Sequence, residues 1–166
     1  KVDGLKGSVA AIAVLPDGRP VEFGTFQEMG EPRCYLRLRD KKGNPLEKLV
    51  PVLESAYCRA IDLKIDRDTG RMHVLVERMS NDETVWWAGE SAAWGKGLKN
   101  IGIGDVGDTA LALAVRPDVV AVCGSRAVAT KDKLDALAVL LRPNEPAEAR
   151  AFDRPADEPK LKHTFA

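Results

Sequence analysis

Three glycines in the second half of the chain have the spacing of a nucleotide-binding loop. Gly102, Gly104 and Gly107 fit the pattern G-x-G-x-x-G, which in dinucleotide-binding domains places a pyrophosphate at the N-terminus of a following helix. The surrounding sequence weakens this interpretation, because Pro117 would end the helix early and Asp105 would face the phosphate unfavourably. We therefore expect a loop between strands here, and we keep a nucleotide-binding α/β domain as an alternative.

An acidic turn is the second candidate for chemistry. Asp66 and Asp68 alternate before Gly70 as the ligands of a calcium loop do, but the twelfth position of such a loop falls on Glu77, inside a predicted strand. A plain hairpin turn is therefore favoured, with Asp66 and Asp68 kept as weak metal candidates. The histidines form no His-x-x-x-His or Glu-x-x-His pair that could hold a catalytic metal.

Nothing in the sequence identifies a nucleophile. None of the five serines lies in a Gly-x-Ser-x-Gly turn, although a triad assembled from distant positions would leave no local signal. We assign no catalytic residue and no cofactor. An enzyme whose active site needs residues outside this chain remains an alternative.

The tryptophans are the candidate binding surface. Trp86, Trp87 and Trp94 are three of nine aromatic residues. Neighbouring residues on a strand point to opposite faces, so one of Trp86 and Trp87 can lie in a core while the other faces solvent or a partner. Protein interfaces are enriched in Trp. Burial of both side chains between stacked sheets is the competing interpretation.

The three cysteines allow at most one internal disulfide. Cys34 and Cys58 are the pair that we favour if any forms, which would leave Cys123 as a thiol. No C-x-x-C motif is present, so zinc ribbons and redox dithiol motifs are excluded. The alternative is that all three are small buried hydrophobic residues.

Charge and hydropathy exclude two classes of partner. Twenty-five Lys and Arg balance 25 Asp and Glu, so the basic surface of a nucleic-acid or polybasic membrane-surface protein is not expected. The longest apolar run, Val9 to Leu15, is too short to span a membrane.

A repeat organises the chain. Three segments begin on Ala11, Ala60 and Ala112, and each continues as a strand, a turn and a second strand; these anchors lie 49 and 52 residues apart. A second landmark starts at Cys34, Val85 and Ala136, 51 residues apart both times. The turns supply Pro, Asp and Gly, as hairpins require. The units cover about residues 8–57, 58–109 and 110–142, each predicted to hold four short strands.

Two segments are ambiguous within this scheme. Residues 134–141 carry a helical stripe of Leu and Ala, but the repeat places a strand there and we follow the repeat. Residues 46–52 are expected to form a fourth strand. Residues 143–166 contain four Pro among mixed charges and are predicted to be an extended tail, or a strand that reaches elsewhere.

The repeat text resembles a known family. The segment from Ala11 through Pro16-Asp17-Gly18 to Gly24-Thr25, followed by Tyr35-Leu36-Arg37 and Gly43-Asn44-Pro45-Leu46, looks like bacterial β-propeller repeats of the delta-sixty type. This resemblance implies an all-β, propeller-like fold in a secreted or cell-surface protein, with a periplasmic location also open. The third unit departs from the pattern, because it lacks the turn Gly after Asp118.

Three units are fewer than the about 4 to 8 blades of closed propellers. An open propeller would expose strands, so we expect further sequence or a second copy to complete a ring, with a three-unit barrel or sandwich as the alternative. The leading function is a non-enzymatic structural or interaction module that binds a protein or a glycan.

Overall fold

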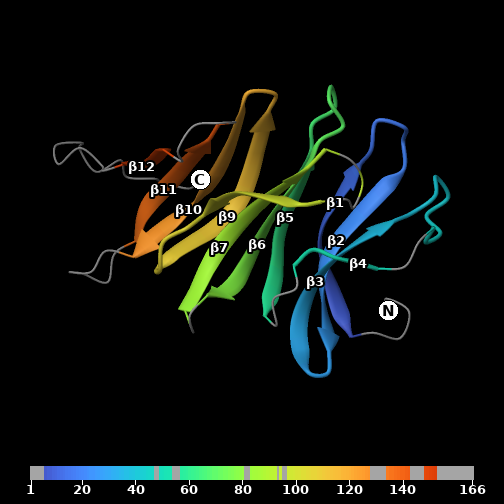
Figure 1. The fold of residues 1–166 in the computed structure, drawn as a ribbon, viewed down its shortest axis with the longest axis horizontal. Coiled ribbons are helices and arrows are strands. Elements are labelled where there is room, and N and C mark those ends of the chain that lie inside the picture. The colour runs from blue at the N-terminus through green and yellow to red at the C-terminus, as the bar shows by residue number, and fades with distance from the viewer. Residues whose placement is uncertain are drawn as a thin grey trace, which may run out of the picture.

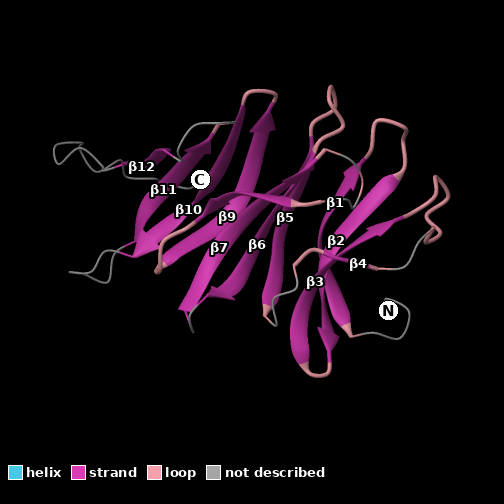
Figure 2. Cartoon of the chain, in the orientation of Figure 1, coloured by secondary structure: helices cyan, strands magenta, loops and turns pink. Residues whose placement is uncertain are grey.

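The protein is all-β throughout the residues that its computed structural model describes, which are 6–46, 49–53, 57–80, 83–92, 94, 97–127, 134–142 and 148–152 (Figure 2). The strands are β1 (Gly7–Val14), β2 (Pro20–Glu28), β3 (Glu31–Leu38), β4 (Val50–Pro51), β5 (Cys58–Ile65), β6 (Met72–Ser80), β7 (Glu83–Ser91), β8 (Lys99–Ile103), β9 (Asp108–Arg116), β10 (Val119–Ala127), β11 (Leu134–Leu141) and β12 (Glu148–Phe152). No described helix is long and apolar enough to cross a membrane.

The strands form three antiparallel sheets of four, each built from consecutive strands. The first sheet holds β1–β4, the second β5–β8 and the third β9–β12. Figure 1 shows them side by side in chain order. The first strands β1, β5 and β9 make the most extensive contacts between sheets, so the sheets converge along these strands. The expectation of three four-stranded antiparallel units is confirmed.

A β-bulge recurs in the first strand of every sheet. The cross-strand pairing skips Ala10 in β1, Ile61 in β5 and Leu111 in β9. Because these bulges mark one structural position, the repeat is 51 and then 50 residues long. A bulge adds one residue to its strand and so shifts every position after it relative to the partner strand.

The bulges correct the alignment made from the sequence. Asp62, and not Ala60, lies at the position of Ala11 and Ala112, directly after the skipped residue. In the third strands, Trp86 rather than Val85 matches Cys34 and Ala136. The sequence alignment was wrong here because it matched the segments on a shared Ala, whereas the second unit has Asp62 at this position.

The turns follow the predicted chemistry. The Leu15 amide donates to the Arg19 carbonyl across Pro16-Asp17-Gly18, and Gly18 has a φ of +86°, which favours glycine. In the second hairpin, the Asp66 amide donates to the Arg71 carbonyl. Residues 134–141 are strand β11, so the repeat predicted this segment better than its helical stripe did.

Two boundaries differ from expectation. The fourth strand of the first sheet is only Val50–Pro51, and residues 47–48 of the predicted strand lie outside the described residues. Within the predicted tail, β12 pairs with β11 and completes the third sheet. The rest of that tail, residues 143–147 and 153–166, also lies outside the described part.

The hydrophobic core lies between the sheets, in two layers. The first layer joins sheets one and two through residues such as Phe23, Leu36, Leu63, Val74 and Trp87. The second joins sheets two and three through residues such as Leu75, Trp86, Leu113, Val122 and Leu137. The second sheet is therefore covered on both faces, whereas sheets one and three each turn one face outward.

Candidate functional site

A cavity of about 460 Å³ opens between the second and third sheets, at the end where the β5–β6 and β9–β10 turns lie. Its polar walls come from five places: the β5–β6 hairpin, β7, the start of β8, the end of β9 and the residue after β11. These side chains are Asp66, Arg71, His73, Glu90, Lys99, Asn100, Arg116 and Arg142. Apolar walls are supplied by Ile101, Pro117, Val119, Val120 and Leu141.

The cavity exists because polar residues replace a core pair of the repeat. Strand pairing puts His73 beside Glu90 at the position where the first sheet has Val21 beside Leu38. Val21 and Leu38 belong to the apolar layer between the first two sheets. The corresponding layer between sheets two and three therefore stops short of this end and leaves a polar pocket.

His73 and Glu90 form the centre of the pocket. The His73 side chain is buried, and its Nδ1 atom lies 3.8 Å from Glu90 Oε2 without a hydrogen-bond partner. Burial lowers the pKa of His73 below its usual value, while the nearby carboxylates of Glu90 and Asp66 act in the opposite direction. The imidazole is therefore neutral near pH 7.

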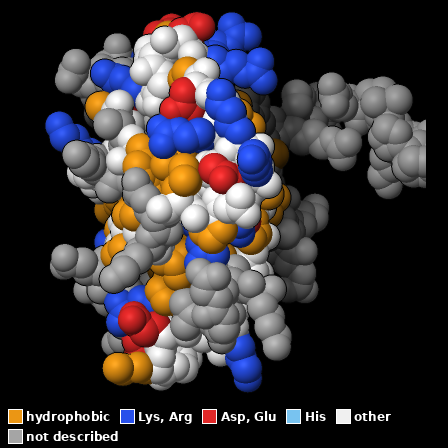
Figure 3. Space-filling model, turned by 90° about the vertical axis from the view of Figure 1, so that its right-hand side faces the viewer, with side chains coloured by type: hydrophobic (Ala, Val, Ile, Leu, Met, Phe, Trp, Pro, Cys, Tyr) orange, Lys and Arg blue, Asp and Glu red, His pale blue; other side chains and the backbone are white. Residues whose placement is uncertain are grey.

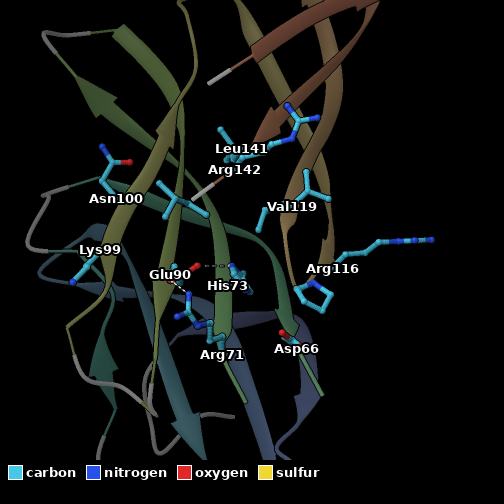
Figure 4. Close-up of a pocket in the computed structure, with 13 residues that line it drawn as sticks. Asp66, Arg71, His73, Glu90, Lys99, Asn100, Arg116, Val119, Leu141 and Arg142 are labelled. Carbon is cyan, nitrogen blue, oxygen red and sulfur yellow. Dashed lines mark hydrogen bonds and ion pairs between the residues drawn. The ribbon is translucent and has the colours of Figure 1, made fainter. Parts of the chain in front are cut away.

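The acidic side chains are engaged within the protein. Glu90 Oε1 accepts a hydrogen bond from Arg71 at 2.9 Å, as Figure 4 shows. Asp66 accepts bonds from the Thr69 hydroxyl and the Asp68 amide, and these bonds hold the pKa of Asp66 below its usual value. Glu90 is paired with a cation of the pocket, whereas Asp66 keeps its negative charge because both of its partners are neutral.

The edge of the pocket is basic. Lys99, Arg116 and Arg142 line it from three separate elements around the His73–Glu90 pair, and their charged ends point outward from that pair (Figure 4). Lys99 and Arg116 are exposed, and no carboxylate of the described residues lies within ion-pair distance of them. Four cationic and two anionic side chains line the cavity, which gives an excess of two positive charges when His73 is neutral.

The pocket offers charge and hydrogen bonds rather than a nucleophile. The described residues that line it include no Ser, Thr, Tyr or Cys. A guanidinium and an ammonium group bind carboxylate, sulfate and phosphate through charge-assisted hydrogen bonds. The arrangement is therefore suited to holding a small anionic ligand.

Trp86 and Trp87 do not form the predicted binding surface. Trp86 and Trp87 do point to opposite faces of β7, but they are 2% and 4% exposed because each lies in a different core layer. Trp94 is half-buried and packs against the first layer. Since the second sheet is covered on both faces, neither face of β7 leaves a Trp for a partner.

The glycine motif serves packing in an all-β segment. Residues 102–107 run from the end of β8 through a turn into β9, so the helix required by the nucleotide-binding alternative is not there. A Cβ atom on Gly102 would overlap Leu141, and one on Gly104 would overlap the Trp86 indole. Asp108, at the start of β9, is held by Arg126, whose Nε lies 2.7 Å from its Oδ1.

The remaining candidates have structural roles. Asp66 and Asp68 belong to the β5–β6 hairpin turn, and no metal-ligand cluster occurs among the described residues. Cys34 and Cys58 form a disulfide between β3 and β5, the pairing that the sequence favoured, while Cys123 is an exposed thiol on β10.

No family model, curated protein or solved structure matches the chain.

Sequence reasoning missed the pocket residues. Lys99, Arg116 and Arg142 carry no motif, because three different elements bring them together. His73 and Glu90 did carry a signal, since both are polar at repeat positions that are apolar in the first unit. An alignment that placed the bulges correctly would have shown it.

Proposed function

We propose that the three sheets are consecutive blades of a β-propeller in a secreted or cell-surface bacterial protein, and that the chain is a non-enzymatic interaction module that binds an acidic glycan. Convergence of the sheets along their first strands supports the propeller arrangement. The Cys34–Cys58 disulfide favours an oxidising compartment such as the cell exterior or periplasm.

The basic edge of the cavity between the second and third sheets carries the binding proposal. Its excess of positive charge attracts an anion, and Lys99 and Arg116 have no competing carboxylate among the described residues. The long side chains of surface cations can adapt to a carboxylate or sulfate group with little rearrangement of the sheets.

The size and lining of the cavity favour a sugar as the bound group, rather than a long stretch of polymer. Ligand pockets in proteins typically enclose about 300 to 1,000 Å³, and this one, at about 460 Å³, lies at the small end of that range. Pro117, Val119 and Leu141 provide apolar contacts for the C–H face of a sugar ring. Asn100 and Glu90 add hydrogen-bonding groups for hydroxyls.

Isothermal titration calorimetry with a tetramer of galacturonic acid tests the proposal. The methyl-esterified tetramer is the matched neutral ligand, because it keeps the same rings and linkages without the charges. We expect binding of the acid only, and a double variant Lys99→Gln, Arg116→Gln should weaken it by about tenfold, or about 1.4 kcal/mol.

The matched control removes the same charge elsewhere. Lys41 and Arg67 are exposed turn residues outside the cavity, so the double variant Lys41→Gln, Arg67→Gln should bind as the parent does. Equal binding of the acidic and esterified tetramers, or equal losses in the two double variants, would show that the basic edge does not recognise the ligand.

A further inference from the structure

The contact between the first and second sheets has a plan whose two halves recur on the outer faces of the chain. Small residues of β1 face larger residues of β5: Ala11 and Ala13 pack against the core layer that contains Leu63, and Ile65 of β5 packs there too. A backbone amide of the incoming strand also donates to a side chain of the preceding sheet. The Ala60 amide donates to Thr25 Oγ1 at 2.9 Å. The second contact keeps the strand geometry but has Asp62 and Lys64 at the positions of Ala11 and Ala13.

The second contact also has a bridge from an amide to a side chain, but at another repeat position and with its acceptor on the first strand of the preceding sheet. The Leu113 amide of β9 donates to Asp62 Oδ2 of β5 at 2.9 Å. In both contacts the donor lies within two residues of the bulge, where the regular ladder of hydrogen bonds is interrupted. In each contact a side chain of the preceding sheet thus pairs with a backbone amide of the next sheet's first strand.

The outward face of the third sheet carries the half of this plan that the first sheet supplies in the first contact, namely the small residues and the hydroxyl acceptor. Ala112 and Ala114 lie on β9 at the positions of Ala11 and Ala13, and Ser125 lies on β10 at the position of Thr25. Cys123 takes the position of the fully buried Phe23, yet it is exposed. Among the described residues, no fourth sheet covers this face.

The outward face of the first sheet carries the other half. Ile12 and Val14 of β1 lie at the positions of Leu63 and Ile65. Ile12 is 63% exposed, whereas Leu63 is 2% exposed. Figure 3 looks onto this end of the molecule, where hydrophobic side chains gather among Lys and Arg. The Val9 amide lies at the position of the Ala60 amide, which donates a hydrogen bond to Thr25 Oγ1 in the first contact.

We infer that the third sheet of one chain docks against the first sheet of a second copy, so that two copies close a ring of six blades. The two halves are complementary but different, and a contact of this kind between identical chains either closes a ring or continues as a fibre. Ala112 and Ala114 would then face Ile12 and Val14, as Ala11 and Ala13 face Leu63 and Ile65 within the chain.

The first sheet differs from its counterparts in one respect that docking must accommodate. Glu22 and Arg37 lie on its outward face, where the second sheet has Val74 and Gly89. Both side chains are already buried in the single chain, and Glu22 pairs with Arg39 at 2.9 Å. Docking therefore removes little additional water from these charges, which limits the desolvation cost.

The inference rests on the propeller part of the proposed function and not on the glycan site. Sedimentation equilibrium should give 36 kDa, twice the 18.0 kDa of one chain, at about 100 µM. The alkylation rate of Cys123 independently measures whether this thiol is buried in the contact between copies. This rate should fall about tenfold between dilute and concentrated protein.

Ile12→Asp tests the docking face directly, because Ile12 is exposed in the single chain and its replacement spares the core. This variant should sediment as a monomer, keep its circular dichroism spectrum and still bind the galacturonate tetramer. Val106→Asp changes an equally exposed apolar residue in the β8–β9 turn and should stay dimeric.

Three outcomes would overturn the inference. A monomer at high concentration with Cys123 still reactive would mean that a second copy does not cover the face. A dimer that survives Ile12→Asp would use another surface, and growth beyond two chains would show that the contact does not close. If the parent protein is dimeric but does not bind the galacturonate tetramer, the result would count against the glycan proposal alone.

Discussion

The two contacts between sheets use the same strand geometry but differ in chemistry. Between the first and second sheets, apolar residues meet along the whole contact and the Cys34–Cys58 disulfide joins them. Between the second and third sheets, the apolar layer around Leu75 and Trp86 gives way to His73 and Glu90 at one end. One contact is a closed core and the other contains a pocket.

The difference shows how a repeat acquires a site without changing its backbone. Val21 and Leu38 in the first sheet occupy the same paired positions as His73 and Glu90 in the second. Exchanging two apolar side chains for two polar ones removes apolar contact and brings in groups that need partners or water. The neighbouring strands then supply Lys99 and Arg116 at the edge.

The largest expected effect compares equivalent core positions in the two contacts. Phe23→Ala should lower the free energy of unfolding by about 4 kcal/mol, because Phe23 is fully buried between the first two sheets. Leu75→Ala, at the same repeat position in the second contact, should cost about 3 kcal/mol, since a smaller side chain is lost. Urea unfolding monitored by tryptophan fluorescence measures both, and a larger loss for Leu75→Ala would contradict the comparison.

The disulfide should contribute the next largest difference. Cys34 and Cys58 lie 24 residues apart, and closing a loop of this length restricts the unfolded chain by about 3 kcal/mol. The double variant Cys34→Ala, Cys58→Ala should lose about that much stability in oxidising buffer. Reductant should lower the stability of the parent to the same level and leave the variant unchanged. A parent that is insensitive to reductant would indicate that the cross-link contributes nothing.

The side chains that bridge the sheets give a smaller contrast. Asp62→Ala should cost about 2 kcal/mol, because it leaves the buried Leu113 amide without its charged acceptor. Thr25→Ala removes a neutral acceptor from the Ala60 amide and should cost about 1 kcal/mol. Amide hydrogen exchange should localise each effect to the matching amide, and equal losses would mean that the charge of Asp62 adds nothing.

Much of the fold could be predicted from the sequence because hairpins are local. The turns at Pro16-Asp17-Gly18 and residues 66–70, together with the recurring strand pattern, predicted three units of four strands. The bulges at Ala10, Ile61 and Leu111 could not be predicted. A bulge interrupts the alternation of inward and outward side chains, but no particular residue type marks it in the sequence. The strand pattern in the sequence was too weak to identify β12, which lies within a Pro-rich segment.

The candidate site was mostly beyond sequence reasoning. Its cations come from the start of β8, the end of β9 and the residue after β11, so only the packing of the second and third sheets brings them together. The tryptophans were conspicuous by type, yet alternation along β7 sends them into the two core layers. Residue type indicated where large side chains occur, but sheet stacking determined which ones a ligand can reach.

The smallest expected effect concerns the pH dependence of the polar contact. His73 has a folded-state pKa below its usual value of about 6.5, because it is buried. Between these two values the unfolded chain binds more protons than the native chain, so stability falls as the pH drops below about 6.5. The slope can reach at most about 1.4 kcal/mol per pH unit, the limit for one proton.

His73→Val installs the residue that the first sheet has at this position, and should flatten the pH dependence while leaving the fold intact. A background with His163→Gln removes the other histidine, so that His73 is the one histidine left to titrate near pH 6, and the slope that His73→Val removes belongs to it. Asp66 faces the same pocket, but its pKa is lowered and its titration lies in a more acidic range. Urea unfolding from pH 7.5 to 5 measures the slope. If the parent and His73→Val lose stability in parallel over this range, burial of the imidazole does not distinguish the second contact from the first.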